Sequence, residues 1–320
     1  KIENRSTRVF INGFRVFVKT LSIKANVFHF HDPELIPWFL LLKFSGRHVV
    51  MDVHEDYPAQ IKGKKWLQPF FRQILSYFIF LLENIATKIF DGIVVADSLL
   101  ADSFKVKSTK TPIIVANNYP LINQNISKIN ITLEKYTSNR ILFLGGINRA
   151  RCSEEFVMAL GDINNNEYEV LMGGNENNNE LLSRIRILKG WSQVKFLGTI
   201  PPGEVDSIMI KSSISINIFS NLPNQTGIRS NRLFEAMAAG LPVIVSDFPN
   251  IKEFIEKYQC GIAVDPNNHR EISKAINALL QDPEYAMELG LNGRKAVLKK
   301  FRWEMEFKKI SNLYNQICYK

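Results

Sequence analysis

Strand-like and helix-like stretches alternate along almost the whole of this 320-residue chain. The stretches that read as buried strands, short and apolar, lie at residues 26–30, 48–53, 92–96, 112–116, 140–144, 169–172, 193–196, 213–218 and 242–245. Longer stretches with helical periodicity lie between them, and the chain is helical from about residue 270. Regular alternation is typical of α/β folds with parallel sheets. We therefore expect parallel sheets covered by helices.

The length and one polar segment predict two domains. A chain of 320 residues is long enough for two domains of ordinary size. Residues 123–138 are polar and rich in asparagine, with little apolar periodicity before Leu133, which is typical of a linker. We therefore predict an N-terminal domain over residues 1–122, a linker over 123–138 and a C-terminal domain over 139–302.

Positive charge is concentrated in the first part of the chain. The net charge is +9, and residues 1–130 hold 17 Lys and Arg against 10 Asp and Glu. A basic domain indicates an anionic partner. Nucleic acid fits poorly, because the basic residues do not interleave with aromatic residues on a strand and no helix-turn-helix or RNA-binding signature is present. An anionic membrane surface or a lipid-phosphate acceptor fits better.

Cysteine and histidine usage argues against disulfides and metals. The three cysteines, Cys152, Cys260 and Cys318, are far apart, and an odd number does not suit a disulfide framework. No Asp-x-Asp pair follows a strand, and no His/Cys cluster has the spacing of metal ligands, so we expect no metal. The sequence shows no signal peptide, and its longest apolar run, residues 74–82, is too short to span a bilayer. We expect a cytoplasmic protein.

The stretch from Arg229 to Pro249 predicts an anion-binding helix. A loop leads into a helix over residues 231–239, Gly240 ends it, and a buried strand follows. The polar residues at its start are Ser230, Asn231, Arg232 and, one turn further in, Glu235. A helix N-terminus carries partial positive charge and free N–H groups, which suit a pyrophosphate, and a carboxylate can accept hydrogen bonds from a ribose diol. The alternative is an ordinary helix capped by Ser230, with a surface glutamate.

A second group of candidate anion ligands follows the strand at 140–144. Gly145 and Gly146 permit close approach of the backbone to a phosphate, and Arg149 and Arg151 bring guanidinium groups near it. The loop at Gly173 follows the strand at 169–172 and is a further candidate for the ligand site. A plain turn between strand and helix explains this glycine equally well.

Two histidines follow predicted strands in the first half. His31 comes after the strand at 26–30, and His54 after the strand at 48–53. Ligands of doubly wound sheets bind beyond the carboxyl ends of the strands, so both face the expected binding edge. Glu55 and Asp56 are candidates for acceptor contacts or a base, but a solvated acidic turn explains them as well. A structural role is the alternative for each histidine.

Three blocks of this sequence resemble family 4 of the retaining glycosyltransferases, which have the GT-B fold. The blocks are LFEAMAAGLPVI at 233–244, FHFHDPELIP at 28–37 with MDVHEDYP at 51–58, and ILFLGGINRAR at 141–151. They resemble, in turn, the nucleotide-sugar signature, the acceptor-side half, and the strand and glycine loop that open the donor domain. The resemblance is closest to members that build bacterial surface polysaccharides, and it covers nearly the whole chain.

This resemblance implies two Rossmann-like domains that face each other across a cleft. It implies that a last helix, over residues 303–320, crosses back to the N-terminal domain. It also implies that the N-terminal domain lacks its first strands, because the chain opens with a charged segment leading into a helix.

The resemblance assigns roles to individual residues. His54 contacts the transferred sugar and is the catalytic candidate, whereas His31, Glu55 and Asp56 are acceptor-side candidates. The residues expected to bind the donor are Gly145, Gly146, Arg149, Arg151, Gly173, Gly227, Ile228, Ser230, Asn231, Arg232 and Glu235. Two positions depart from the family pattern. Gly227 stands where the first of two glutamates is expected, and one expected cation is missing, which Arg232 replaces.

The implied function is transfer of a sugar from a nucleoside-diphosphate sugar to a glycan or lipid-linked glycan, with retention and without a metal, in bacterial polysaccharide biosynthesis. The alternatives are a catalytically silent GT-B subunit, which Gly227 favours, and a nucleotide-sugar epimerase or hydrolase. Basic residues beside aromatic ones at Lys62–Arg72 predict peripheral contact with an anionic membrane. The alternative there is a core-facing helix with a solvated basic start.

Overall fold

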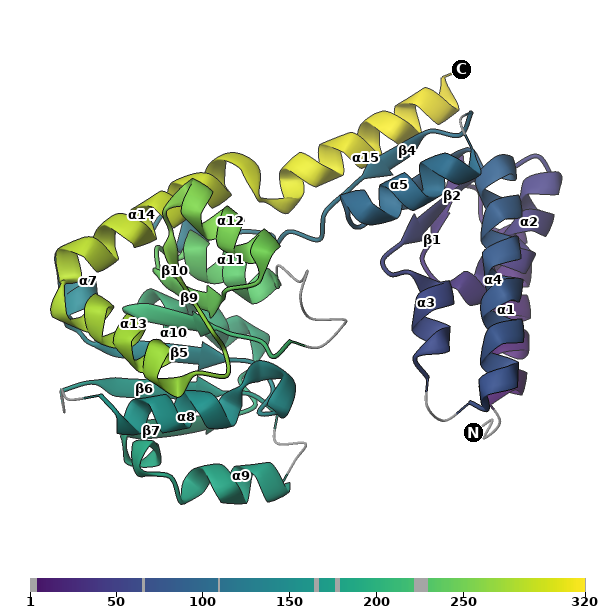
Figure 1. The fold of residues 1–320 in the computed structure, drawn as a ribbon. Coiled ribbons are helices and arrows are strands. Elements are labelled where there is room, and N and C mark those ends of the chain that lie inside the picture. Colours follow the sequence, from purple (N-terminus) through teal and green to yellow (C-terminus); the bar gives the residue numbers. More distant parts are fainter. Residues whose placement is uncertain are drawn as a thin grey trace. The chain divides into compact units, whose positions relative to one another are not determined.

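The computed structural model describes residues 5–64, 67–108, 110–163, 167–175, 179–221 and 230–319. The chain divides into two compact units, which are described separately (Figure 1). Unit 1 comprises Lys1–Asn118 and Trp303–Lys320, and unit 2 comprises Tyr119–Arg302. The C-terminal residues therefore belong to the same unit as the N-terminal ones.

Unit 1 is built on a parallel sheet of four strands in the order β1-β2-β3-β4. Its elements in chain order are α1 (Arg5–Leu21), β1 (Val27–Phe30), the 3-10 helix η1 (Pro33–Leu35), α2 (Ile36–Phe44), β2 (His48–Val53), α3 (Tyr57–Lys62), α4 (Pro69–Ile89), β3 (Gly92–Val95), α5 (Ser98–Lys107), β4 (Ile113–Val115) and α15 (Trp303–Cys318).

Alternate residues of these strands face two different layers. Val49, Met51 and Val53 of β2 pack into a core shared with α2, α4 and α5. Val50 lies on the other face, in a core shared with α15. Successive side chains of a strand point to opposite faces, so Asp52 shares the α15 face with Val50. The sheet of unit 1 is thus covered on both faces, as expected of a parallel sheet.

Unit 2 is built on a parallel sheet of six strands in the order β10-β9-β8-β5-β6-β7. Its elements are α6 (Gln124–Ser127), α7 (Leu133–Thr137), β5 (Arg140–Leu144), η2 (Arg149–Arg151), α8 (Ser153–Gly161), β6 (Glu169–Gly173), α9 (Asn179–Arg186), η3 (Lys189–Gln193), β7 (Val194–Gly198), α10 (Pro202–Ile210), β8 (Ile214–Asn217), α11 (Asn231–Ala238), β9 (Val243–Ser246), α12 (Pro249–Tyr258), β10 (Gly261–Val264), α13 (His269–Gln281) and α14 (Pro283–Lys300).

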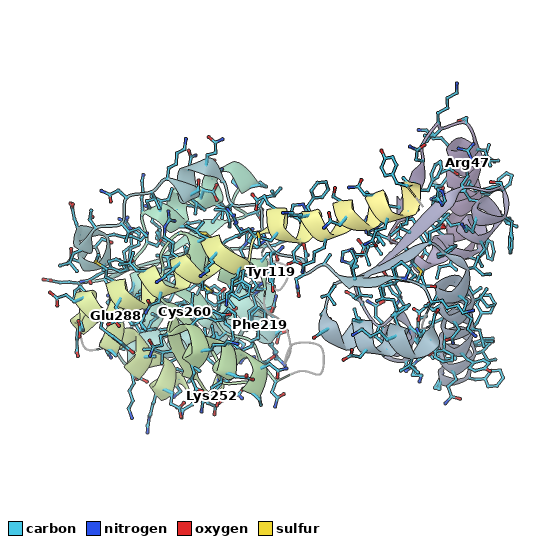
Figure 2. All side chains as sticks on the ribbon, turned by 90° about the horizontal axis from the view of Figure 1, so that it is seen from above. Arg47, Tyr119, Phe219, Lys252, Cys260 and Glu288 are labelled. Atoms are coloured by element: carbon cyan, nitrogen blue, oxygen red, sulfur yellow. The ribbon has the colours of Figure 1, made fainter. Side chains whose placement is uncertain are left out.

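The sheet of unit 2 has the strand order of a Rossmann fold. Read from β7, the order corresponds to 3-2-1-4-5-6 in chain sequence. Helices cover it, and the interior is apolar: Cys260 is fully buried, whereas Lys252 and Glu288 lie at the surface (Figure 2). Every strand pair in both sheets is parallel, which confirms the predicted α/β class.

Residues 123–138, which we expected to form a linker, contain the short helices α6 and α7 and belong to unit 2. Ile126 and Tyr136 are buried there, and the Tyr136 hydroxyl donates a hydrogen bond to the carbonyl oxygen of Gly240 at 2.6 Å. Gly240 itself has φ +74° and ends α11, a conformation that favours glycine. Ile131 also packs against the core of unit 2, and Lys135 Nζ donates to the Ile210 carbonyl at 2.7 Å, so this segment is anchored to unit 2.

Candidate functional site

The first candidate site lies at the carboxyl ends of β5 and β8 in unit 2. These two strands are neighbours in the sheet, yet the chain leaves them toward opposite edges, so they form the topological switch point. Open parallel sheets bind ligands in the crevice at such a point. Gly145 and Gly146 follow β5 there, and Phe219 comes two residues after β8.

Arg151 lies across this switch point. Its Nη1 donates to the carbonyl oxygen of Leu144 at 3.3 Å, and its guanidinium carbon lies 4.7 Å from the centre of the Phe219 ring. A Cβ on Gly145, whose φ is +145°, would lie 2.5 Å from that guanidinium carbon. Glycine is therefore required at position 145 for Arg151 to pack over the loop.

The loops after β5 and β6 are also in contact. The Gly145 N–H donates to the Gly173 carbonyl at 2.9 Å, and a Cβ on Gly174 would lie only 1.6 Å from the Gly145 carbonyl oxygen. Gly146 is less crowded, and Arg149 is exposed at the start of η2. The glycines predicted to approach a phosphate therefore also serve to bring these two loops together.

The start of α11 supplies the second cation. Ser230 caps the helix by accepting from the Leu233 N–H at 3.4 Å, and Asn231 is its first residue. Arg232 Nη1 donates to Glu235 Oε2 at 2.7 Å, so these two candidates form an ion pair. The candidates Gly227 and Ile228 lie outside the described residues.

The two arginines are electrostatically coupled. Burial lowers the pKa of Arg151, and the positive charge of Arg232 lowers it further. Two cations that destabilise each other are relieved by an anion that contacts both. Several donor-site residues predicted from the sequence therefore lie together at the carboxyl edge of the sheet of unit 2. They are Gly145, Arg151, Gly173, Arg232 and Glu235.

The second candidate site lies at the carboxyl ends of β1 and β2 in unit 1. Three histidines surround Asp52, whose Oδ2 atom lies 3.3 Å from His29 Nε2, 3.2 Å from His31 Nδ1 and 3.5 Å from His54 Nε2. The last two nitrogens are 3.1 Å apart. His29 Nδ1 is hydrogen-bonded to the hydroxyl of Tyr314 on α15. We call His29, His31, Asp52 and His54 the His–Asp cluster.

Electrostatics favour the charged forms of Asp52 and His54. Burial would raise the pKa of Asp52, but its contacts with His29 and His54 outweigh burial and hold that pKa well below its usual range. The hydrogen bond to Asp52 raises the pKa of His54 above its ordinary value, against the opposing effect of burial. A carboxylate and an imidazolium are therefore the favoured pair at this edge.

From the sequence, His31 and His54 were predicted at this edge, whereas His29, Asp52 and Tyr314 were missed. The signal available in the sequence was spacing: His29 and His31, and likewise Asp52 and His54, are two residues apart and so share a face. Tyr314 carried no such signal.

The other two acceptor-side candidates form local contacts. The Asp56 carboxylate caps α3 by accepting from the Ala59 N–H at 2.9 Å, and Glu55 accepts from the side-chain amide of Gln60. Both contacts lie within the turn and the first part of α3. They agree with the structural alternative for these residues.

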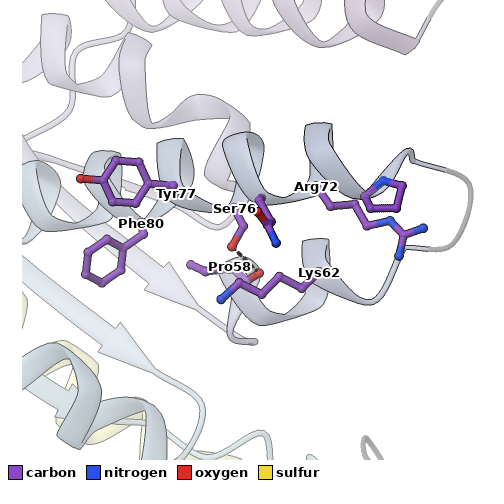
Figure 3. Close-up of a pocket in the computed structure, with 8 residues that line it drawn as sticks. Pro58, Lys62, Arg72, Ser76, Tyr77 and Phe80 are labelled. Atoms are coloured by element: carbon purple, nitrogen blue, oxygen red, sulfur yellow. Dashed lines mark hydrogen bonds between the residues drawn. The ribbon is translucent and has the colours of Figure 1, made fainter.

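A third feature of unit 1 is a pocket of about 680 Å³ between α3 and α4 (Figure 3). Its lining combines cations and aromatic rings: Pro58, Lys62, Pro69, Arg72, Gln73, Ser76, Tyr77 and Phe80. Two residues of the lining are joined by a hydrogen bond: the buried Ser76 hydroxyl donates to the Pro58 carbonyl at 2.8 Å. Lys65 and Trp66, from the predicted membrane segment, lie outside the described residues.

Within the described ranges, no helix combines the length and the apolar composition that crossing a membrane requires.

Comparison with known proteins places this chain in a family. Residues 125–296 match the family described as Glycosyl transferases group 1. Spore coat protein SA of Bacillus subtilis is 26% identical over 187 residues, which is 55% of this chain and 48% of that protein. The chain spans about half the length of the first curated relatives that it matches.

Solved structures show the same fold. A glycosyltransferase from Rickettsia africae superposes with a TM-score of 0.71 at 16% identity, covering 99% of this chain and 83% of that one. Anabaena Alr3699/HepE in complex with UDP-glucose gives a TM-score of 0.66 at 16% identity, covering 95% and 82%. The two parallel α/β units agree with the GT-B fold of these enzymes. The family match spans more than half of the chain, so this protein belongs to group 1 of the glycosyl transferases.

Proposed function

We propose that this protein transfers a sugar from a nucleoside-diphosphate sugar to a hydroxyl group of a glycan or lipid-linked glycan. The observation that carries the proposal is the position of Arg151 at the switch point of a Rossmann sheet, where its guanidinium packs over Phe219 after β8, together with the capped N-terminus of α11 that carries Arg232. The solved relative from Anabaena holds UDP-glucose, and UDP-sugars carry the diphosphate that such a pair would bind.

The leaving group of this reaction is a nucleoside diphosphate, whose negative charge grows as the sugar departs. Arg151 and Arg232 would stabilise that charge, together with the free N–H groups at the start of α11. We propose that no metal is needed at the diphosphate, because two guanidinium groups can take its place. Membership of the family and the sequence blocks at 233–244 and 141–151 support retention of anomeric configuration and a role in bacterial polysaccharide biosynthesis.

A panel of nucleotides tests the proposal. Unfolding temperature would be measured with UDP, GDP, ADP and their sugars, because a ligand that binds only the folded protein raises its stability. We expect one nucleoside diphosphate to raise it in a concentration-dependent way. No response to any member of the panel would contradict the proposal.

Turnover separates the proposal from its alternatives. A silent subunit would bind a nucleotide but release no diphosphate, whereas a hydrolase would release it without an acceptor. A transferase releases it only when acceptor is present, and NMR of the product reports whether configuration is retained.

Glu235 is proposed to accept hydrogen bonds from the ribose diol. Its carboxylate now pairs with Arg232, so ribose binding would share that carboxylate with the arginine. Replacing Glu235 with Gln keeps the shape but removes the charge, and donor affinity should fall by about 1.5–3 kcal/mol, the value of a hydrogen bond to a charged group. Titration calorimetry with the nucleoside diphosphate measures this. An unchanged affinity, or a complex in which Glu235 points away from the ribose, would exclude the assignment.

We further propose that unit 1 contacts an anionic bilayer, where a lipid-linked acceptor would be held. Helix α4 buries one face through Ile79 and Ala86, yet its opposite face exposes large apolar side chains. The exposed large apolar residues of α4 are Phe70, Phe71, Ile74, Leu75, Tyr77, Phe78, Phe80, Leu81 and Ile85. Lys62 and Arg72 line the pocket beside them. Aromatic and basic residues together suit a membrane interface.

Vesicle binding tests this contact. Replacing Phe70 and Phe71 with Ser should weaken sedimentation with phosphatidylglycerol vesicles by about tenfold or more, because each ring contributes about 1.5–3 kcal/mol when buried. These rings are 68% and 56% exposed, so folding should be preserved. Phe307, which is 53% exposed on α15 of the same unit, supplies the control Phe307→Ser. The proposal is contradicted if the variant lacking Phe70 and Phe71 binds the vesicles as well as Phe307→Ser does. It is also contradicted if the parent protein binds uncharged vesicles as well as phosphatidylglycerol vesicles.

A further inference from the structure

We propose that the His–Asp cluster of unit 1 is a binding site for a divalent transition-metal ion of the zinc class, with His29 Nε2, His31 Nδ1 and Asp52 Oδ2 as its ligands. These three atoms all lie within 4.8 Å of one another. None of these three ligands is among the residues assigned to the nucleotide, which belong to unit 2.

The distances fit a small tetrahedral ion. Ligands about 2.0–2.1 Å from a tetrahedral zinc ion lie about 3.3 Å from one another. Asp52 Oδ2 lies 3.3 Å from His29 Nε2 and 3.2 Å from His31 Nδ1. Both separations from Asp52 Oδ2 are therefore those expected between two ligands of one tetrahedral ion.

One ligand atom lacks a hydrogen-bond partner. His29 Nε2 is buried and has no hydrogen-bond partner among the described residues, and its contact with Asp52 Oδ2 at 3.3 Å is that of an ion pair. Buried polar nitrogens are normally satisfied, so an orphaned one calls for an explanation. A metal ion beside Asp52 would supply the missing partner.

A residue outside the ligand set orients His29. The Tyr314 hydroxyl is hydrogen-bonded to His29 Nδ1, which leaves Nε2 directed at Asp52. Metal-binding histidines are held in this way, with the second ring nitrogen fixed by another group. Tyr314 lies on α15, so the C-terminal helix would help to shape a metal site formed by β1 and β2 (Figure 1).

The donor set selects the class of metal. Two imidazole nitrogens and one carboxylate oxygen suit zinc and its neighbours, whereas magnesium and calcium prefer oxygen ligands. Asp52 is almost buried, but the His31 side chain is 59% exposed, so the fourth position would open to water or to a hydroxyl oxygen. His54, whose Nε2 lies 3.1 Å from His31 Nδ1, would border that position.

Titration calorimetry with Zn²⁺ tests the site. Protein stripped of metal would be studied in a Cys318→Ser background, because Cys318 is a half-exposed free thiol and thiols also bind zinc. We expect one Zn²⁺ per chain, no competition from Mg²⁺, and loss of this binding in His31→Gln and His29→Gln. Tyr314→Phe keeps the ring but not the hydroxyl, and it should weaken binding by about 10- to 100-fold.

His48 supplies a matched control. It lies at the opposite end of β2, and its Nδ1 is also 3.2 Å from a carboxylate oxygen, that of Asp91. His48→Gln should leave Zn²⁺ affinity unchanged. The proposal is overturned if the protein binds no Zn²⁺, if His31→Gln binds it as the parent does, or if His48→Gln loses it to the same extent. Should His29→Gln fail to fold, the exposed His31 and the conservative Tyr314→Phe still decide the question.

Discussion

Replacing His54 with alanine is expected to lower turnover by about 10- to 100-fold while nucleotide affinity changes little. His54 follows β2 and is hydrogen-bonded to Asp52, which raises its pKa and favours its charged form. We propose that it contacts the transferred sugar. Loss of a hydrogen bond to a charged group costs about 1.5–3 kcal/mol, which corresponds to this change in rate.

The two measurements in this experiment separate two roles. Loss of a contact made at the reacting centre lowers kcat/KM without weakening the binding of the nucleoside diphosphate. Turnover would be measured with a donor and acceptor known to be used, and affinity by calorimetry. His48→Gln, a histidine at the far end of the same strand, is the control and should retain activity. Equal activity of the parent and His54→Ala would show that His54 has no part in the reaction.

The strands that position both sites could be predicted because their hydrophobic patterns are local. The predicted strands at 48–53 and 140–144 match β2 and β5 at both ends. Because the residues after these strands lie at the binding edge of a parallel sheet, His54 and Gly145 could be assigned to sites without a structure. The short strand β10 was missed, since it begins at Gly261 and the three apolar residues that follow carry too little pattern.

The partners of these residues could not be predicted, because they are far apart in the chain. The bond between His29 and Tyr314 joins residues 285 positions apart, and no local spacing indicates it. The expectation of no metal rested on ligand spacing along the sequence, whereas the ligands that we propose in the His–Asp cluster come from two separate segments, His29 and His31 from one and Asp52 from the other. The packing of Arg151 over Phe219 could not be predicted either, because it depends on β5 and β8 being neighbours in the sheet.

Replacing Arg151 with alanine is expected to weaken binding of the nucleoside diphosphate by about 10- to 100-fold. Arg151 lies half-buried over the Phe219 ring, and its charge is destabilised first by burial and then by Arg232. An anion that contacts both arginines relieves this repulsion and gains hydrogen bonds worth about 1.5–3 kcal/mol each. The fold should survive, because the substitution removes an unfavourable pair of like charges from the unbound protein.

A double-mutant cycle makes this prediction specific to the diphosphate. Arg232→Ala alone should also weaken binding, and the double variant should deviate from the sum of the single effects if both cations contact one anion. The matching nucleoside, which lacks phosphates, should bind the parent and Arg151→Ala equally well. Arg270→Ala, which removes an exposed arginine from the first turn of α13, is the control for net charge. Unchanged affinity in both single variants would exclude the assignment, whereas a loss that extends equally to the nucleoside would indicate that Arg151 supports the loop rather than binding the diphosphate.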